Sequence, residues 1–275
     1  PIWNLPAKRT MPDGTEVDNV YNPRAGIGDF LFMGSMPSLR YVPQVYATDV
    51  FANTSWRKKT LTVEAEISSA RPMKVEFLIN VKDPDGNVVK SDKVQAKLVP
   101  GTTRVEKEIP WKDPVTWEIG RGYLYTLETA ISAPGLGRLE QKPVVFGFRE
   151  IWREGKEIMM NGHKQCFRTV YQYGANENGY EFLSRMGFNT IHMSHVQEKD
   201  PKIDEKKLKW LSEHGMGLVA PTSVVKFDEQ GALRSNARAY NDYESALGRN
   251  LKRYRNWPCI VMCYTGVNNE IQFWC

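Results

Sequence analysis

Glu270 is the residue of this sequence with the clearest potential for acid–base chemistry. Together with Asn269 it follows closely on the apolar stretch 259–264. We predict that this stretch is the fourth strand of a parallel sheet, so Glu270 lies at its carboxyl end, where parallel α/β folds place their chemistry. A carboxyl group there can donate or accept a proton. Taken alone, an Asn-Glu pair is a weak signal and more often marks an ordinary surface carboxylate.

The histidines do not predict a metal centre. His192 and His195 lie three residues apart on or just after a predicted strand. Side chains at that spacing point to opposite faces of the strand and make a poor chelate. Gly135-Leu136-Gly137 falls among antiparallel strands, so the sequence has no glycine-rich phosphate loop between a strand and a helix. We therefore predict no metal and no cofactor.

Residues 41–150 have the alternation of half-buried β-strands. Apolar residues recur at every second position in 61–67 and 75–79, and Asp83-Pro84-Asp85-Gly86-Asn87 is a strong turn sequence. Further strands are predicted at 88–98, 104–109, 123–132 and 142–148. Six or seven short strands without a helical period favour a β-sandwich of immunoglobulin type.

After residue 150 predicted strands and helices alternate. Strands are expected at 165–170, 188–193, 216–220 and 259–264, with a helix between each pair. The second helix begins at a predicted Asp204 cap and ends at Gly215. This order predicts a parallel sheet with crossover helices. The periodicity alone fits a TIM barrel and an open doubly wound sheet equally well.

Short motifs occur in a fixed order between 117 and 270: Trp117 with Tyr123-Leu124-Tyr125-Thr126-Leu127, Gly147-Phe148-Arg149-Glu150-Ile151, Asn161-Gly162, Phe167-Arg168, Met186-Gly187-Phe188-Asn189-Thr190, Ser194-His195, and Arg255-Asn256 with Pro258. Through this ordered set the sequence resembles glycoside hydrolase family 2, which includes β-galactosidases, β-glucuronidases and β-mannosidases. The resemblance implies the end of a jelly-roll sugar-binding domain or a linker at 1–40, an immunoglobulin-like sandwich at 41–150, and the first half, about four β/α units, of a TIM (β/α)8 barrel at 151–275.

The resemblance implies hydrolysis of β-glycosides with retention, by two carboxyl groups about 5 Å apart. The residue matching Glu270 is the family's general acid/base, and the one matching Asn269 binds the sugar 2-hydroxyl. The family's nucleophile is a Glu at the seventh barrel strand, beyond this sequence. We therefore expect the chain to be a fragment that is inactive alone.

Four further residues are candidates for carbohydrate binding. The resemblance places His195 at the mouth of the barrel, where it contacts sugar, and Arg168 near the catalytic carboxylates. A partly buried structural histidine and a buried ion-pair arginine are equally compatible with the sequence. Tyr171 and Tyr173 follow the first strand and could stack on a pyranose ring. Two positions depart from the family pattern: Trp257 replaces the usual His before the proline, and His192 replaces an Arg expected on the second strand. These departures leave the sugar specificity open and are also compatible with an inactive family member.

Bulk properties limit the partners. The net charge is +5, but basic and acidic residues are interleaved, which argues against nucleic-acid binding. No apolar run reaches the about 18 residues that a membrane span needs. A half barrel would expose the edges of its fourth and first strands, so we expect the chain either to self-associate through those edges or to leave much of 150–275 poorly ordered. The resemblance leans toward a secreted or periplasmic enzyme.

A second interpretation is a non-catalytic carbohydrate-binding or scaffolding module, in which the sandwich carries the function. The two interpretations differ in the continuation of the gene. A Glu at the end of a seventh strand there favours the enzyme, and its absence favours the binding module.

Overall fold

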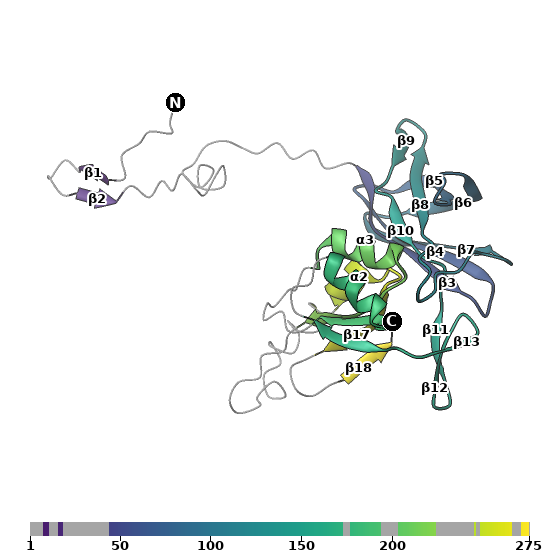
Figure 1. Ribbon diagram of the computed structural model, residues 1–275. Coiled ribbons are helices and arrows are strands. Elements are labelled where there is room, and N and C mark those ends of the chain that lie inside the picture. The colour runs from purple at the N-terminus through teal and green to yellow at the C-terminus, as the bar shows by residue number, and fades with distance from the viewer. Residues whose placement is uncertain are drawn as a thin grey trace. The chain divides into compact units, whose positions relative to one another are not determined.

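The computed structural model describes residues 8–10, 16–18, 44–172, 177–193, 203–223, 245, 248–265 and 271–274. The chain forms two compact units, Pro1–Pro43 and Gln44–Cys275 (Figure 1). In the first unit, β1 (Lys8–Thr10) pairs antiparallel with β2 (Glu16–Asp18). No helix within the described ranges is long and apolar enough to cross a membrane.

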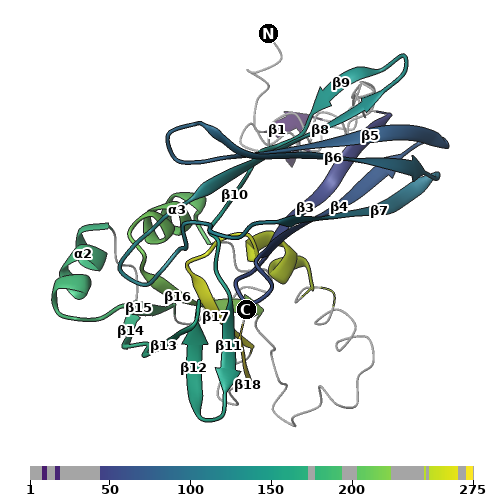
Figure 2. The ribbon, with the colours of Figure 1, turned by 90° about the vertical axis from the view of Figure 1, so that its right-hand side faces the viewer.

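Two antiparallel sheets form the first part of the second unit (Figure 2). One has the order β3-β4-β7 and the other the order β10-β8-β5-β6, with β9 also paired to β8. Their bounds are Val45–Ser55 for β3, Thr60–Ser69 for β4, Met73–Lys82 for β5, Val88–Leu98 for β6, Gly101–Pro110 for β7, Tyr125–Ala133 for β8, Gly137–Glu140 for β9 and Val144–Phe146 for β10.

Alternation of buried and exposed side chains joins the two sheets into one core. The predicted apolar positions of β4, from Leu61 to Ile67, and of β5, from Val75 to Ile79, are at most 2% exposed. Both sets belong to a single cluster. Because successive side chains of a strand point to opposite faces, each strand offers one face to this shared core. The sandwich-like arrangement agrees with the prediction from sequence.

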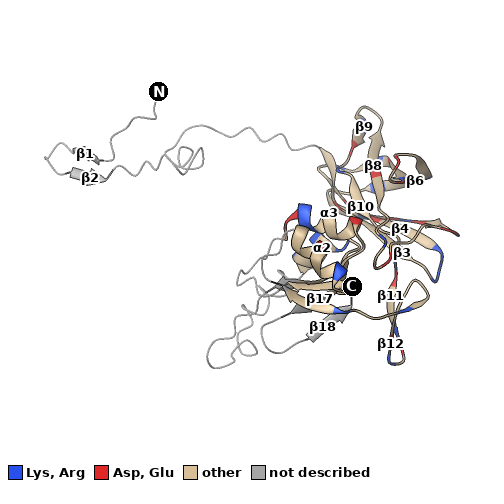
Figure 3. Ribbon diagram, in the orientation of Figure 1, with Lys and Arg blue, Asp and Glu red and all other residues tan. Residues whose placement is uncertain are grey.

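The outward faces of the sandwich carry both signs of charge. Basic and acidic residues are interspersed along its strands (Figure 3), and many form ion pairs across them. Lys93 lies 2.9 Å from Glu76, and Arg104 lies 2.7 Å from Glu64. Such exposed pairs each contribute about 1 kcal/mol or less. Their value here is to keep the outer faces polar.

A small antiparallel sheet, which the sequence pattern did not predict, follows the sandwich. It consists of β11 (Ile151–Glu154), β12 (Glu157–Met160) and β13 (His163–Gln165). Asn161, at φ 48° and 2% exposed, connects β12 to β13. Its side chain accepts from the backbone N–H of Glu150 at 2.8 Å and donates to the carbonyl of Trp117 at 2.9 Å. These bonds fix the small sheet against the chain that precedes it.

Two indole rings also join this small sheet to the sandwich. Trp152 of β11 stacks on Trp56, with ring centroids 6.1 Å apart. The Lys59 ammonium lies 4.0 Å from the Trp56 ring and the Arg57 guanidinium 4.8 Å from the Trp152 ring. Each cation adds about 0.5–1 kcal/mol at an exposed site. We call this group the tryptophan column.

The remaining strands form a mainly parallel sheet with the order β14-β15-β16-β17-β18. The first four, β14 (Thr169–Gln172), β15 (Thr190–Met193), β16 (Gly217–Ser223) and β17 (Ile260–Thr265), are parallel, as predicted. β18 (Ile271–Trp274) pairs antiparallel with β17. The fourth parallel strand is therefore not the edge of the sheet, contrary to our expectation. Within the described residues β14 pairs with β15 alone.

Helices connect these strands, and their ends follow local sequence signals. They are α2 (Glu177–Arg185), α3 (Glu205–Glu213) and the helical residues 248–254. The Asp204 side chain accepts from the N–H of Lys206 at 3.0 Å, which confirms the predicted cap. Gly215, at φ 62°, follows α3, and a Cβ there would lie 2.4 Å from the backbone nitrogen of Arg121. Only glycine allows this approach.

Ionisation of Tyr125 is expected to make the sandwich less stable at alkaline pH. The residue is 2% exposed, and its hydroxyl accepts from the N–H of Val115 at 2.9 Å. Burial raises the pKa of Tyr125 to about 12. The folded chain therefore keeps a proton that the unfolded chain releases above about pH 10, so this contribution to stability falls as pH rises from about 10 to 12.

The free energy of unfolding should fall between about pH 8 and about pH 10.5. We predict that this fall is about 1 kcal/mol smaller in Tyr125→Phe than in the unchanged chain, because the phenylalanine has no proton to lose. Urea unfolding of both proteins at the two pH values measures this difference. Arg149 and Cys259, whose pKa values burial also shifts, are present in both proteins and cancel. Equal losses in the two proteins would contradict the assignment to Tyr125.

Candidate functional site

Tyr171 presents an exposed ring in the carboxyl half of β14. It pairs in register with His192 of β15, and the two rings stack with centroids 5.1 Å apart and an interplanar angle of 21°. Tyr171 is 55% exposed. The stack holds the tyrosine ring in one orientation on this edge of the sheet. A ring held in this way offers a flat apolar surface to a ligand.

Arg168 lies at the other end of the same strand. It immediately precedes β14, and its backbone N–H donates to the side-chain oxygen of Asn189 at 2.6 Å. Its Nε donates to the carbonyl of Gly187 at 2.5 Å. The side chain is exposed. The structure therefore does not bring Arg168 to the end of the strand that Tyr171 occupies, and its contacts hold the loop that leads into β15.

The other candidates from sequence, Tyr173, His195, Asn269 and Glu270, lie outside the described residues. In the sequence they follow the last residues of β14, β15 and β17, which are Gln172, Met193 and Thr265. Among the side chains that the structure describes, no group of three or more His, Cys, Asp or Glu could hold a metal ion.

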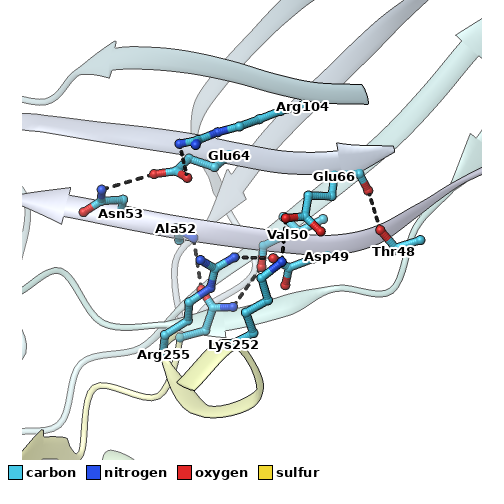
Figure 4. Close-up of polar contacts among 11 residues, drawn as sticks. Thr48, Asp49, Val50, Ala52, Asn53, Glu64, Glu66, Arg104, Lys252 and Arg255 are labelled. Atoms are coloured by element: carbon cyan, nitrogen blue, oxygen red, sulfur yellow. Dashed lines mark hydrogen bonds and ion pairs between the residues drawn. The ribbon is translucent and has the colours of Figure 1, made fainter. Parts of the chain in front are cut away.

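The amino end of β17 contacts the sandwich through a group of polar residues (Figure 4). Arg255 forms an ion pair with Asp49 of β3, and its guanidinium lies 4.1 Å from the Phe51 ring centroid. Lys252 lies 2.5 Å from Glu66 of β4. The Arg255 pair is largely buried, with side-chain exposures of 26% and 18%. Truncation of one partner would leave the other charge poorly solvated.

Asn256 bonds directly to the backbone of β3. Its Oδ1 accepts from the N–H of Ala52 at 3.0 Å, and its Nδ2 donates to the carbonyl of Val50 at 2.9 Å. A neighbouring strand offers the same combination of one donor and one acceptor. The Asn256 amide therefore takes the place of a strand at this edge of the three-stranded sheet.

Three further residues, of which Trp117 and Gly147 are buried and Arg149 is half-buried, complete this contact. The guanidinium of Arg149 donates to the carbonyl of Ile260, the first residue of β17, at 2.6 Å, and burial lowers the pKa of Arg149 to about 10. Trp117 is fully buried, and its indole N–H donates to the carbonyl of Ser212 at 2.7 Å. A Cβ at Gly147 would lie 2.7 Å from the Cβ of Pro258. The sandwich and the segment before β17 therefore approach each other too closely at Gly147 for any larger side chain.

A groove of about 500 Å³ runs beside this contact. Its polar walls bond to other protein groups, since Asp49 pairs with Arg255, Lys252 with Glu66, and Gln141 accepts from the N–H of Ala47. The groove is therefore part of the contact between the sheets. It is separate from the strand end that carries Tyr171.

The sandwich matches a known protein family. Residues 45–149 match the family model described as glycosyl hydrolases family 2. A search of curated proteins found no match. The family resemblance stated from the sequence motifs is thus confirmed over the sandwich, while the motifs after residue 149 lie outside the matched range.

Solved structures extend the likeness to most of the chain. A family 2 glycosyl hydrolase from Bacteroides cellulosilyticus covers 82% of this chain with a TM-score of 0.68 and 18% identity. Bacteroides uniformis β-glucuronidase covers 82% with a TM-score of 0.63 and 20% identity, and Dictyoglomus thermophilum β-D-mannosidase covers 81% with a TM-score of 0.66 and 16% identity. At these low sequence identities, the TM-scores show a shared fold alone. The chain spans 32%, 29% and 29% of those proteins, respectively.

We predict that Gly147→Ala destabilises the chain by about 1–3 kcal/mol, because the new methyl group has no space. It would lie 2.7 Å from the Cβ of Pro258 and 2.8 Å from the Cβ of Trp117, and neither residue can move aside easily. Gly248→Ala is the matched control, since a Cβ there meets nothing within 4 Å. Thermal unfolding measures both variants, and equal midpoints would show that the contact can yield.

Proposed function

We propose that this chain, whose residues 45–149 match glycosyl hydrolases family 2, is part of a retaining β-glycosidase. The proposal assigns an immunoglobulin-like sandwich to 41–150, the first half of a (β/α)8 barrel to 151–275, and the end of a jelly-roll domain or a linker to 1–40. The family match carries the proposal. Four parallel strands in chain order, after the sandwich and the small antiparallel sheet, support it, because a (β/α)8 barrel begins with such strands.

In the proposed mechanism Glu270 is the general acid/base. It protonates the leaving oxygen while a second carboxylate attacks the anomeric carbon, and it then deprotonates the water that releases the sugar. Asn269 donates a hydrogen bond to the sugar 2-hydroxyl. The attacking carboxylate, about 5 Å from Glu270 in a retaining enzyme, would come from a part of the parent protein that follows this chain.

The exposed ring of Tyr171 supports a carbohydrate substrate. A pyranose can pack against its face, and the stack with His192 already holds the ring in place. We assign Tyr173 and His195 to the same surface because they follow the ends of β14 and β15 in the sequence. Arg168 bonds to Asn189 and Gly187 at the opposite end of β14, so we assign it the role of fixing the loop before β15.

A non-catalytic carbohydrate-binding or scaffolding module is the second candidate function. One observation favours it: the family model matches the sandwich and not the parallel sheet.

With either function, we propose that the chain self-associates through the outer edge of β14. In the described structure β14 pairs only with β15, so its other edge carries unpaired backbone groups.

We predict that the purified 275-residue chain hydrolyses aryl β-glycosides no faster than its Glu270→Gln variant, because an acid without a nucleophile cannot complete the reaction. Release of nitrophenol from a panel of aryl β-glycosides measures this. Turnover well above the variant would show that the chain holds a complete site.

We predict that Glu270→Ala in the complete protein lowers hydrolysis of glycosides with poor leaving groups by about 100-fold to 10,000-fold. Dinitrophenyl glycosides, whose leaving group needs no proton, lose much less in the first step. Added azide should restore turnover by attacking the glycosyl-enzyme and releasing the enzyme carboxylate, which yields a β-glycosyl azide. Glu213→Ala, at the exposed end of α3, is the control. Identical behaviour of the two variants would refute the role of Glu270.

A further inference from the structure

The amino end of β17 is held by the sandwich at two polar contacts four residues apart. Asn256 bonds to β3, and Ile260 accepts from Arg149. We propose that Asn256 and Arg149 are positioning residues, which set the place of β17 and, through it, the place of Glu270. The catalytic consequence rests on the proposed function, whereas the effect on β17 does not.

Asn256 can hold the chain because it satisfies an edge strand. β3 lies at the end of the order β3-β4-β7, so Ala52 and Val50 have backbone groups that need partners outside the sheet. The amide supplies both partners from a single side chain. Asp at this position keeps the acceptor for the N–H of Ala52 but replaces the donor with an oxygen that faces the carbonyl of Val50.

Arg149 takes its position from the same strand. Thr54 of β3 donates from Oγ1 to the carbonyl of Arg149 at 2.6 Å and accepts from its backbone N–H at 3.2 Å. The guanidinium then reaches the carbonyl of Ile260. Between the two contacts, Pro258 packs against Gly147. The start of β17 is therefore held relative to β3 by hydrogen bonds on both sides of Pro258.

A strand transmits this position along its length. From Ile260 to Thr265 β17 extends about 16 Å, and Glu270 follows five residues later. Reacting groups displaced by about 1 Å can lose about 100-fold in rate. A change at Asn256 would thus alter the rate although the residue lies at the opposite end of the strand from the sugar.

The first measurement follows amide hydrogen exchange in the 275-residue chain. We expect Asn256→Asp to speed exchange of β17 amides about tenfold, because a buried carbonyl loses its donor. Peptides from β5 should not change. Asn80→Asp is the matched control: Asn80 uses its side-chain oxygen to accept from Ser91 at 2.8 Å, and Asp keeps that acceptor. Asn256→Ala, which adds no charge, replaces the aspartate variant if that variant does not fold.

The second measurement uses the complete protein. We expect Asn256→Asp to lower kcat about tenfold per folded molecule with KM nearly unchanged, and to move the basic limb of the kcat/KM profile, which reports the acid. Asn80→Asp should leave all three values unchanged. A residue that only stabilises the fold would lower the amount of active enzyme and leave the pH profile in place.

Two results would overturn the proposal: unchanged exchange in β17, or faster exchange with an unchanged kcat and pH profile. Failure of the proposed function appears separately, in the Glu270→Ala variant. That substitution lies beyond the end of β17 and alters neither contact with β3.

Discussion

β3 is the strand on which both parts of the second unit depend. One of its edges pairs with β4, and the backbone of the other meets the side-chain amide of Asn256. Edge strands carry unpaired N–H and C=O groups that must be satisfied or solvated. Because these partners come from the segment just before β17, the sandwich cannot complete its own edge. The first residue of the fourth parallel strand, Ile260, in turn accepts a hydrogen bond from Arg149 of the sandwich.

We call the contact between the sandwich and the segment before β17 the junction. Because each part depends on the other there, side chains of the junction are closely packed, while the outer faces of the sandwich carry exposed charged residues. Trp117, Gly147 and Pro258 pack with no room for an added methyl group. Arg149 is half-buried, and the removal of its guanidinium from water lowers the pKa of Arg149 to about 10. On the outward sandwich faces, exposed ion pairs such as Lys93 with Glu76 contribute little. The specificity of the arrangement therefore lies in the junction.

Much of the fold could be predicted from local sequence patterns, whereas the junction could not. Alternation located β4 to β8, and Asp204 located the start of α3. β3 was missed because its register shifts between Ala47 and Asp49, which breaks the period of two. The pairs of Asp49 with Arg255 and of Asn256 with β3 join residues more than 200 positions apart and leave no local signal. For the candidate site, the strand pattern predicted a strand at 165–170 with Tyr171 just past its end, whereas β14 runs from Thr169 to Gln172. Tyr171 therefore lies within the strand, and Arg168 precedes it.

The tryptophan column gives the molecule an optical property. Two indoles stacked 6.1 Å apart couple their electronic transitions, so the pair produces an exciton signal in circular dichroism that isolated indoles lack. The signal depends on the mutual orientation of Trp56 and Trp152, which belong to the sandwich and to the small sheet that follows it. Separation of those two parts would extinguish it while the secondary structure of each persists. The chain thus carries its own spectroscopic report of the contact between the sandwich and the small sheet.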